Sequence, residues 1–452
     1  MILNNKKVLV VGLAKTGLSA AKFLLQKNSI VTVADIHSEK ESVKIAAQEL
    51  HALGAAIELG HHNEQTFLQS DLIVLSPGVP HTILPIQKAI DKGIPVIGET
   101  ELASRFIQSP MIAITGTNGK TTTTELVGEI LRLSGKKVFV GGNIGTPLTN
   151  LLLEQNNVDG IVLELSSFQL DTIDTFCPDV AVILNITEDH LYRYENMDDY
   201  AASKFNIFKN QQPEHTAILN AQDEYCLKNA TSIKSRIFWI DNDNPDCQKI
   251  SVNCHSKEQM IFPFGLTIDI SQTPLIGHHN RQNIAAAILS AHKLGATSDG
   301  IQKAIHSFKG LPHRVEFIRT INGISFYNDS KATNVDAVVK ALSCFEQPVH
   351  LILGGQDKGG DYSVLIPLIT KNVCECILIG EAHNIIRKSL QTPQLDHIPF
   401  YNATTLESAI QKAYENARSG DAVLLSPACA SFDMFDSYNH RGNVFKNTVQ
   451  SL

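Results

Sequence analysis

The sequence predicts an α/β protein that consists of three units, each with a parallel sheet. Short apolar runs of strand length alternate with amphipathic segments of helix length along nearly all of the 452 residues. This alternation is typical of parallel sheets that helices cover on both faces. The strand pattern restarts twice, and the chain is too long for a single hydrophobic core.

The strand candidates form three sets, separated near Gly98 and Gly310. The first set comprises residues 8–12, 30–35, 72–76 and 95–98. The second set comprises 111–115, 160–167 and 179–185. The third set comprises 324–329, 350–355, 376–380 and 422–426. We therefore expect domains at residues 1–97, 98–310 and 311–452. The polar stretch 222–275 is irregular, and we expect short strands and loops there.

The composition excludes several classes of protein. With 43% hydrophobic and 19% charged residues, the chain resembles ordinary globular proteins. Its net charge of −8 gives no general attraction to nucleic acid or to anionic membranes. We therefore expect no nucleic-acid partner. No apolar run is long enough to span a bilayer, so we also expect no membrane insertion. The eight cysteines include no CxxC pair, which favours reduced thiols and a cytoplasmic location.

Residues 115–122, TGTNGKTT, are predicted to bind the phosphates of a nucleoside triphosphate. The buried strand 111–115 precedes them, and a helix follows with Leu126, Ile130 and Leu133 on one face. Backbone N–H groups at the start of such a helix point at the anion, and the helix dipole favours negative charge there. The alternative, a structural turn with an exposed lysine, explains this context less well.

The residue types inside this loop suit phosphate chemistry. Gly116 and Gly119 allow the backbone to approach the ligand closely, and Lys120 adds a positive charge. Thr121 offers a hydroxyl group to Mg²⁺. The loop departs from the GxxxxGK[ST] pattern because Ile114 occupies the position of the first glycine.

Polar residues also follow the next strands of the second set. Glu164 ends one strand, where its carboxylate can reach a metal held by the phosphate loop. His190 follows the next strand and could complete a second metal site or position a phosphoryl group. The alternative for His190 is a surface loop histidine. Lys204 lies on an amphipathic segment and, taken alone, would be interpreted as a solvated lysine.

The first unit contains an incomplete dinucleotide-binding pattern. Gly12 and Gly17 are present, but Ala14 replaces the middle glycine of GxGxxG. Asp35 ends the second strand, where a ribose-binding acid would lie. NAD binding is one interpretation, but another diphosphate-bearing nucleotide fits better, because the middle glycine is missing.

Three polar clusters follow strands of the third unit. They are NDSKATN at 328–334, GGQDKGG at 354–360 and SPACASFD at 426–433. Because the carboxyl ends of parallel strands share one edge, we expect Lys331, Lys358 and Ser431 to face a common crevice. Two lysines and several hydroxyl groups suit an anionic substrate such as an amino-acid carboxylate.

Taken together, these motifs resemble the Mur ligase family from about residue 6 to the C-terminus. The family-wide markers are TGTNGKTT, NITEDH at 185–190, the asparagines 280 and 283, LPHR at 311–314 and NDSKATN. These markers also fit the folylpolyglutamate synthetases, though more loosely. GGNIG at 141–145, LELSSFQL at 163–170, GGQDKG and LSPACASFD are typical of the family members that add D-glutamate.

This resemblance implies a fold and a reaction. The fold is a Rossmann-like N-terminal domain that binds UDP, a central P-loop ATPase-like domain, and a Rossmann-like C-terminal domain that binds the amino acid. The reaction is the ATP-dependent addition of D-glutamate to UDP-N-acetylmuramoyl-L-alanine through an acyl phosphate. It is a cytoplasmic step of peptidoglycan precursor synthesis, and we expect a monomer.

The resemblance also implies roles for individual residues. The catalytic residues would be Lys120, His190 and Lys204. ATP would contact Gly116, Thr117, Asn118, Gly119, Lys120, Thr121, Thr122, Asn280, Asn283, Arg314, Asp329 and Lys331. The UDP substrate would contact Lys15, Thr16, Asp35, Ser76, Asn143, Ser166 and Gln169. D-glutamate would contact Thr333, Lys358, Ser431, Phe432 and Tyr438. Two Mg²⁺ ions would be held by Thr121, Glu164, His190 and Lys204, the last as a carbamate.

Three positions depart from the family's pattern. Tyr192 stands where we expect an aspartate, which changes the groups that support His190. His37 stands where an arginine often follows the uridine-site aspartate, and Tyr438 replaces a frequent phenylalanine. The alternatives at this point are a ligase for another amino acid, a folate-glutamylating enzyme, and a nucleotide-binding regulatory module without turnover.

Overall fold

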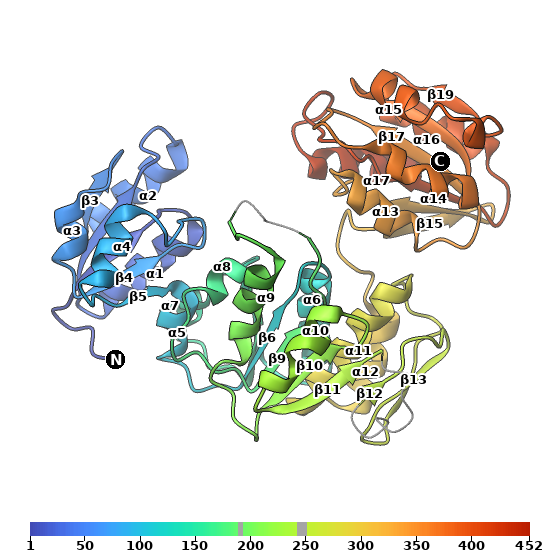
Figure 1. Cartoon of the computed structure of the whole chain (residues 1–452). Helices are drawn as coiled ribbons and strands as arrows, with labels where there is room; N and C mark the ends of the chain where they lie inside the picture. The colour runs from blue at the N-terminus through green and yellow to red at the C-terminus, as the bar shows by residue number, and fades with distance from the viewer. Residues whose placement is uncertain (189–192, 242–250) are drawn as a thin grey trace. The chain divides into compact units, whose positions relative to one another are not determined.

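The computed structural model describes residues 1–188, 193–241 and 251–452. The described strands form three large sheets and one two-stranded hairpin (Figure 1). The chain divides into two compact units. The first unit comprises Met1–Ser271 and Gln282–Ile305, and the second comprises Gln272–Arg281 and His306–Leu452. The predicted α/β class with parallel sheets is confirmed.

The first sheet has five parallel strands in the order β3-β2-β1-β4-β5. The strands are β1 (Lys7–Val11), β2 (Ile30–Asp35), β3 (Ala56–Leu59), β4 (Leu72–Leu75) and β5 (Val96–Gly98). The helices are α1 (Lys15–Gln26), α2 (Glu41–Ala52), α3 (Glu64–Leu68) and α4 (Leu84–Asp91). Phe23 of α1 and Leu50 of α2 belong to one buried cluster, and Phe67 of α3 and Ile86 of α4 belong to another. The helices therefore bury both faces of the sheet.

The second sheet has seven parallel strands in the order β12-β11-β10-β9-β6-β8-β7. The strands are β6 (Met111–Thr115), β7 (Val138–Gly142), β8 (Gly160–Glu164), β9 (Val180–Ile183), β10 (Thr216–Asn220), β11 (Arg236–Ile240) and β12 (Ser251–Val252). A hairpin follows with β13 (Gln259–Ile261) and β14 (Thr267–Asp269). The strands β7 and β10 were not predicted, whereas β11, β12, β13 and β14 lie in the stretch 222–275, where short strands and loops were expected.

Eight helices accompany this second sheet in the described part of the chain. They are α5 (Glu99–Ser104), α6 (Lys120–Leu133), α7 (Leu148–Glu154), α8 (Ser167–Leu170), α9 (Met197–Phe205), α10 (Glu224–Asn229), α11 (His278–Lys293) and α12 (Ser298–Ser307). Leu126 and Ile130 of α6 are fully buried, as predicted. The predicted helix is confirmed, and Leu133, its last residue, is 39% exposed.

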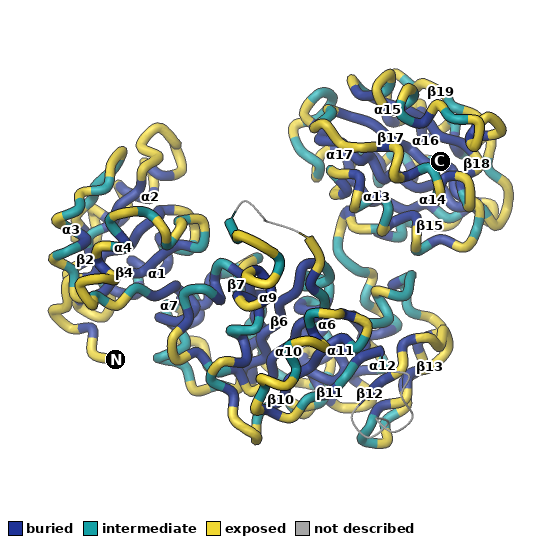
Figure 2. The backbone as a smooth tube through the Cα atoms, in the orientation of Figure 1, coloured by how far each residue is buried: buried dark blue, intermediate teal, exposed yellow. Residues whose placement is uncertain are grey.

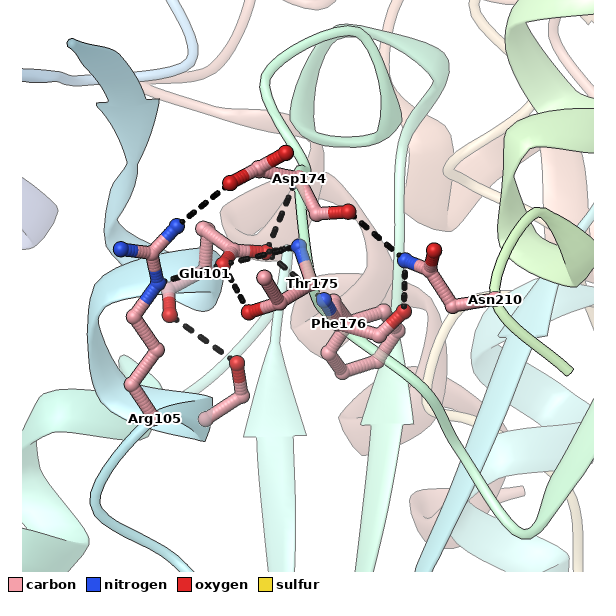
Figure 3. A network of polar contacts seen from close by, with 7 residues as sticks. Glu101, Arg105, Asp174, Thr175, Phe176 and Asn210 are labelled. Atoms are coloured by element: carbon pink, nitrogen blue, oxygen red, sulfur yellow. Dashed lines mark hydrogen bonds and ion pairs between the residues drawn. The ribbon is translucent and has the colours of Figure 1, made fainter.

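Glu101 of α5 fixes the loop that follows α8 (Figure 3). This buried carboxylate accepts hydrogen bonds from the backbone N–H groups of Asp174, Thr175 and Phe176 and from the Thr175 hydroxyl. It also pairs with Arg105, with Nε 2.6 Å from Oε1. Burial raises the pKa of Glu101, but these hydrogen bonds outweigh burial and leave the pKa below its ordinary value. The segment that leaves the first sheet is thus bonded to the second.

The third sheet has the order β15-β16-β20-β17-β18-β19. Its strands are β15 (Glu316–Ile321), β16 (Ile324–Asn328), β17 (Val349–Gly354), β18 (Val373–Ile379), β19 (Phe400–Asn402) and β20 (Ala422–Leu425). Its helices are α13 (Val335–Leu342), α14 (Ile366–Asn372), α15 (His383–Ser389), α16 (Leu406–Asn416) and α17 (Tyr438–Ser451). Figure 2 shows the strands as a buried interior. The helices α13, α14 and α15 cover one face, and α16 and α17 cover the other.

Strand β15 departs from the parallel arrangement, because it pairs with β16 in the antiparallel direction. The two strands are joined by Asn322 and Gly323, which have φ angles of 50° and 80°. Positive φ at both central residues is typical of a two-residue hairpin turn, and Asn-Gly is its preferred sequence. Within the described residues, no helix is both long and apolar enough to cross a bilayer.

Candidate functional site

The predicted phosphate loop joins the buried strand β6 to helix α6. Gly116 and Gly119 have φ angles of 148° and 85°, which residues with a side chain rarely adopt. A Cβ atom on Gly119 would also clash with Oδ1 of Asn283. The loop backbone thus lies directly against Asn283, one of the predicted ATP-binding residues.

A neighbouring loop, Asn185–Thr187, holds the phosphate loop in place. The Asn185 side chain accepts a hydrogen bond from Asn118 N at 2.8 Å and donates one to Asn118 O at 3.1 Å. Thr187 N donates to Thr117 Oγ1 at 3.0 Å. Asn185 begins the motif NITEDH, but no role was predicted for it. Its side chain fixes the backbone that is expected to surround the phosphates.

Two lysines contact the same carbonyl group of the phosphate loop. The Lys120 ammonium donates to Gly116 O at 3.0 Å and to Thr117 O at 2.9 Å. The Lys204 ammonium donates to Gly116 O at 2.9 Å and lies 4.5 Å from the centre of the Tyr200 ring. Lys204 is only 1% exposed, so its interpretation as a solvated lysine is wrong. The structure therefore brings both predicted catalytic lysines together at a place that favours anions.

Glu164 lies at the end of β8, beside Ile114 of the strand that leads into the phosphate loop. Its Oε1 accepts a hydrogen bond from Asn143 Nδ2 at 2.9 Å. Its Oε2 is buried and has no hydrogen-bond partner among the described residues. An unpaired buried carboxylate oxygen is costly, and hard divalent cations prefer such oxygen ligands. The residues present therefore fit a divalent cation.

Thr115 is the last residue of β6 and the first of TGTNGKTT, but no role of its own was predicted for it. Its hydroxyl is fully buried and has no hydrogen-bond partner in the described part of the chain. The predicted metal ligand Thr121 and its neighbour Thr122 are half-buried in the first turn of α6. The predicted ligand His190 and the variant position Tyr192 lie outside the described residues.

The predicted UDP-binding residues of the first sheet gather at the carboxyl ends of its strands. The Asp35 carboxylate accepts hydrogen bonds from Leu13 N at 2.6 Å and from His37 N at 2.8 Å. The Ser76 hydroxyl donates to Gly12 O at 2.7 Å. These bonds connect the ends of β1, β2 and β4, which is the edge where nucleotides bind in open α/β sheets.

The other UDP-site candidates lie on or beside neighbouring helices. The Lys15 ammonium, in the first turn of α1, donates to Gly145 O. The next residue, Thr16, is half-buried. Gln169 Oε1 accepts from both the N–H and the hydroxyl of Ser166 at 3.0 Å, as part of a capping box at the start of α8. Their contact with a substrate remains a prediction.

The second unit contains most of the remaining candidates. The Asp329 carboxylate accepts a hydrogen bond from the Ser426 hydroxyl at 2.7 Å and from Val315 N at 3.1 Å. Burial raises the pKa of Asp329 to about 7. The Lys331 ammonium lies 5.5 Å from the centre of the Tyr438 ring. The loops that follow β16 and β20 are thus bonded to each other.

The loops with Lys358 and Ser431 are joined by an isolated antiparallel bridge. Gln356 N donates to Ala430 O at 2.9 Å, and Ala430 N donates to Gln356 O at 3.0 Å. Ser431 is buried, whereas Phe432 is 69% exposed. The other members of the predicted adenine and amino-acid sites in this unit are Asn280, Arg314, Thr333 and Lys358. Asn280 and Thr333 are half-buried, and Arg314 and Lys358 are exposed.

Arg441 joins two loops of the second unit, and no sequence motif had pointed to it. This residue of α17 is fully buried, and its guanidinium donates to Ser330 O, Cys429 O and Ala430 O at 2.8, 3.1 and 3.2 Å. Arg441 is the fourth residue of α17, and the sequence gives no sign of its burial because the helix pattern there is weak. Arg441 links the loop of Lys331 with the loop of Ser431.

Three family models match most of the chain. Residues 6–98 match the Mur ligase MurD-like N-terminal domain, 114–291 match the Mur ligase middle domain, and 313–429 match the Mur ligase glutamate ligase domain. A UDP-N-acetylmuramoylalanine–D-glutamate ligase of Desulfatibacillum aliphaticivorans is 47% identical over 100% of both chains. The enzyme of the same name from Geotalea daltonii is 46% identical over 100% of this chain and 99% of its own.

Solved structures agree on the fold. A MurF ligase from Thermotoga maritima in complex with ADP has a TM-score of 0.59 at 18% identity, and the match covers 100% of this chain and 99% of that chain. At this identity the likeness concerns the fold alone. Because full-length relatives are more than 40% identical and all three domain types match in order, the chain belongs to the Mur ligase family.

Proposed function

We propose that this chain is an ATP-dependent ligase that joins D-glutamate to UDP-N-acetylmuramoyl-L-alanine. The relatives that carry this activity in their name match the entire chain at 46–47% identity. The observation that carries the proposal is the unpaired buried oxygen of Glu164 in the sheet that bears the phosphate loop. A metal-bound triphosphate needs both of these features.

The residues of the phosphate loop would activate a carboxylate. A carboxylate oxygen of the alanyl group forms a bond to the γ-phosphorus of ATP as the bond from phosphorus to ADP breaks. Lys120 would balance negative charge that spreads over the phosphoryl oxygens in this step. The amine of D-glutamate then attacks the acyl carbon, loses a proton, and phosphate leaves with the electron pair of its bond.

Two Mg²⁺ ions would neutralise the charges of the triphosphate and the acyl phosphate when they are bound. Thr121 and Glu164 would hold the first ion. His190 and Lys204 would hold the second, with Lys204 carbamylated. Lys204 is buried against Gly116 O, and a carbamate there would replace its positive charge with the oxygen ligands that Mg²⁺ prefers.

The substrate-binding residues would divide between the domains 1–97, 98–310 and 311–452. Lys15, Thr16, Asp35 and Ser76 would bind the UDP group, and Asn143, Ser166 and Gln169 would bind the muramoyl-alanyl group. The adenosine would contact Asn280, Asn283, Arg314, Asp329 and Lys331, and D-glutamate would contact Thr333, Lys358, Ser431, Phe432 and Tyr438. We further propose a monomer in the cytoplasm with no nucleic-acid partner and no membrane insertion.

Transfer of a heavy oxygen isotope tests this function. UDP-N-acetylmuramoyl-L-alanine with labelled carboxylate oxygens is incubated with the chain, ATP and D-glutamate, and the released phosphate is analysed by mass spectrometry. We expect one labelled oxygen in each phosphate, because the carboxylate oxygen stays on phosphorus. Unlabelled phosphate would show that ATP is hydrolysed by water instead. Nucleotide binding without phosphate release would favour the regulatory module.

A further inference from the structure

A small pocket in the first unit lies apart from the candidate active site. Its cavity has a volume of about 250 Å³ and is lined by Arg236, Phe238, Pro263, Phe264, His292 and Lys293. Arg236 begins β11, and in the register of this parallel sheet it is level with the first residues of β10 and β9. The phosphate loop follows the opposite, carboxyl end of β6. The pocket therefore opens at the other edge of the same sheet.

Two cationic side chains lie beside the same aromatic ring in this pocket. The Lys293 ammonium lies 4.6 Å from the centre of the Phe238 ring, and the Arg236 guanidinium lies 5.1 Å from it. Neither side chain has a carboxylate partner within the part of the chain that the structure describes. Burial, followed by repulsion from Arg236, lowers the pKa of Lys293. An anion between the two groups would relieve this repulsion.

This concentration of positive charge is not a general property of the surface. The chain as a whole has a net charge of −8. In surface pairs such as Lys88–Glu64 and Lys303–Asp299, a carboxylate balances the lysine. Arg236 and Lys293 instead point their charges at an uncharged ring and an open cavity.

The opposite wall of the pocket is flat and uncharged. The Phe264 ring stacks on the His292 ring, with centroids 3.6 Å apart and an angle of 6° between the planes. Burial, followed by repulsion from Lys293, lowers the pKa of His292, which favours the neutral imidazole at neutral pH. A planar ring of a ligand can stack on such a wall while its anionic group faces the cations.

We propose that this pocket binds a small planar anion, namely a single aromatic or heteroaromatic ring that carries one phosphate or carboxylate group. The volume is slightly below the range of about 300–1,000 Å³ for drug-sized ligands, which suits one ring with one anionic group. The pocket also borders α11, the helix that carries Asn283 against the phosphate loop. Asn283 and Lys293 lie about 15 Å apart along this helix.

Histidine-selective NMR of the full chain with phenyl phosphate tests the proposal at the pocket itself. The His292 signal is assigned by its loss in the His292→Gln variant. We expect phenyl phosphate to shift this signal in a saturable manner, with an affinity that falls as salt is added. Phenol, which lacks the anionic group, leaves the signal in place. Inorganic phosphate, which lacks the ring, binds at least about ten-fold more weakly.

Matched variants separate the pocket from other anion sites. Arg236→Gln combined with Lys293→Gln is expected to weaken the binding at least about ten-fold, because both charged contacts are lost. Lys209→Gln combined with Lys234→Gln removes the same charge from exposed positions and leaves the affinity unchanged. Arg236→Lys keeps the charge and retains most of the affinity, which guards against a folding defect. Equal affinity in wild type and the Arg236→Gln/Lys293→Gln variant would overturn the proposal, and so would equal affinity for inorganic phosphate and phenyl phosphate.

Discussion

Arg441 donates hydrogen bonds to both the carbonyl oxygen and the hydroxyl group of Ser330, at 2.8 and 3.0 Å. The same guanidinium reaches the carbonyl groups of Cys429 and Ala430, so one side chain connects the loops that follow β16 and β20. Burial lowers the pKa of Arg441 to about 10, and the group still carries its charge at neutral pH. Because these loops carry Thr333 and Ser431, we expect Arg441 to set the spacing of the proposed D-glutamate site.

We predict that Arg441→Lys raises the KM for D-glutamate about ten-fold or more while the KM for ATP changes less. A lysine ammonium has three donors on one atom and cannot span the carbonyl groups that the planar guanidinium joins. Steady-state kinetics with each substrate varied in turn measures the effect. The control is Arg319→Lys, because Arg319 is exposed and, among the described residues, donates only to Gln450 O at 3.2 Å.

Two outcomes would contradict this role for Arg441. An unchanged KM for D-glutamate in a folded Arg441→Lys variant would show that the loop spacing does not depend on the guanidinium. An equal increase of the KM for all three substrates would show that the guanidinium does not act on the D-glutamate site in particular. Ser330→Ala offers a milder second test, because it removes the hydroxyl that accepts from Arg441 Nε and donates to Tyr438 O but keeps the carbonyl contact to Arg441.

Glu164→Gln is predicted to reduce kcat on the order of 10²–10³-fold and to raise the Mg²⁺ concentration that is needed for half-maximal rate. The amide is a weaker ligand for a hard cation than the carboxylate. Thermal unfolding without metal should show no loss of stability, because the change removes a buried oxygen that has no partner among the described residues. Glu154→Gln, at an exposed position, is the control. An unaltered Mg²⁺ dependence would remove Glu164 from the metal site.

Lys204→Ala is predicted to abolish most of the activity, and short-chain carboxylic acids should restore part of it. A small acid can enter the space left by the side chain and supply the oxygen ligands of a carbamate. Rates are measured with increasing acetate in wild type and variant. Lys209→Ala, on an exposed position nearby in sequence, should behave like wild type with and without acetate. Full activity of Lys204→Ala without any additive would contradict a role in metal binding.

His350 is predicted to stabilise the C-terminal sheet in its protonated form. Its Nδ1 lies 2.7 Å from Glu375 Oε1, and its Nε2 lies 3.1 Å from Asp421 Oδ2. Burial lowers the pKa of His350, but the hydrogen bonds and charges of these two carboxylates outweigh burial and raise the pKa above its ordinary value. The stabilisation is therefore complete below about pH 6.5 and is lost as the pH rises through the raised pKa.

Hydrogen exchange of the Leu351 and Ile352 amides of β17 measures this effect. The free energy of opening should fall as the pH rises through the neutral and mildly alkaline range. His350→Gln should remove this part of the pH dependence, whereas His440→Gln, at a site with a 48% exposed side chain, should retain it. A pH dependence that is the same in wild type and His350→Gln would contradict the prediction.

Much of the fold followed from local patterns. Residues 30–35 and 111–115 were predicted as strands and form β2 and β6 with the same bounds, because buried parallel strands are continuous apolar runs. The antiparallel strand β15 was missed, although Asn322-Gly323 is a sequence signal for its turn. The strand ends also predicted which polar residues gather at one edge.

The contacts that support the site could not be predicted in this way. Asn118 and Asn185 are 67 residues apart, and Ser330 and Arg441 are 111 residues apart. Such hydrogen bonds depend on the final approach of two loops, and no periodicity in the sequence encodes it. The burial of Lys204 has the same origin, because it depends on how α9 packs beside the phosphate loop.

The most direct test of the central claim is ADP release with each substrate omitted or exchanged in turn. With ATP, Mg²⁺ and UDP-N-acetylmuramoyl-L-alanine present, the account predicts sustained ADP release with D-glutamate and almost none with L-glutamate. Omission of the UDP substrate should stop the release, because no carboxylate is then available to accept the phosphoryl group. Equal rates with D- and L-glutamate, or release that does not require the UDP substrate, would contradict the proposed function.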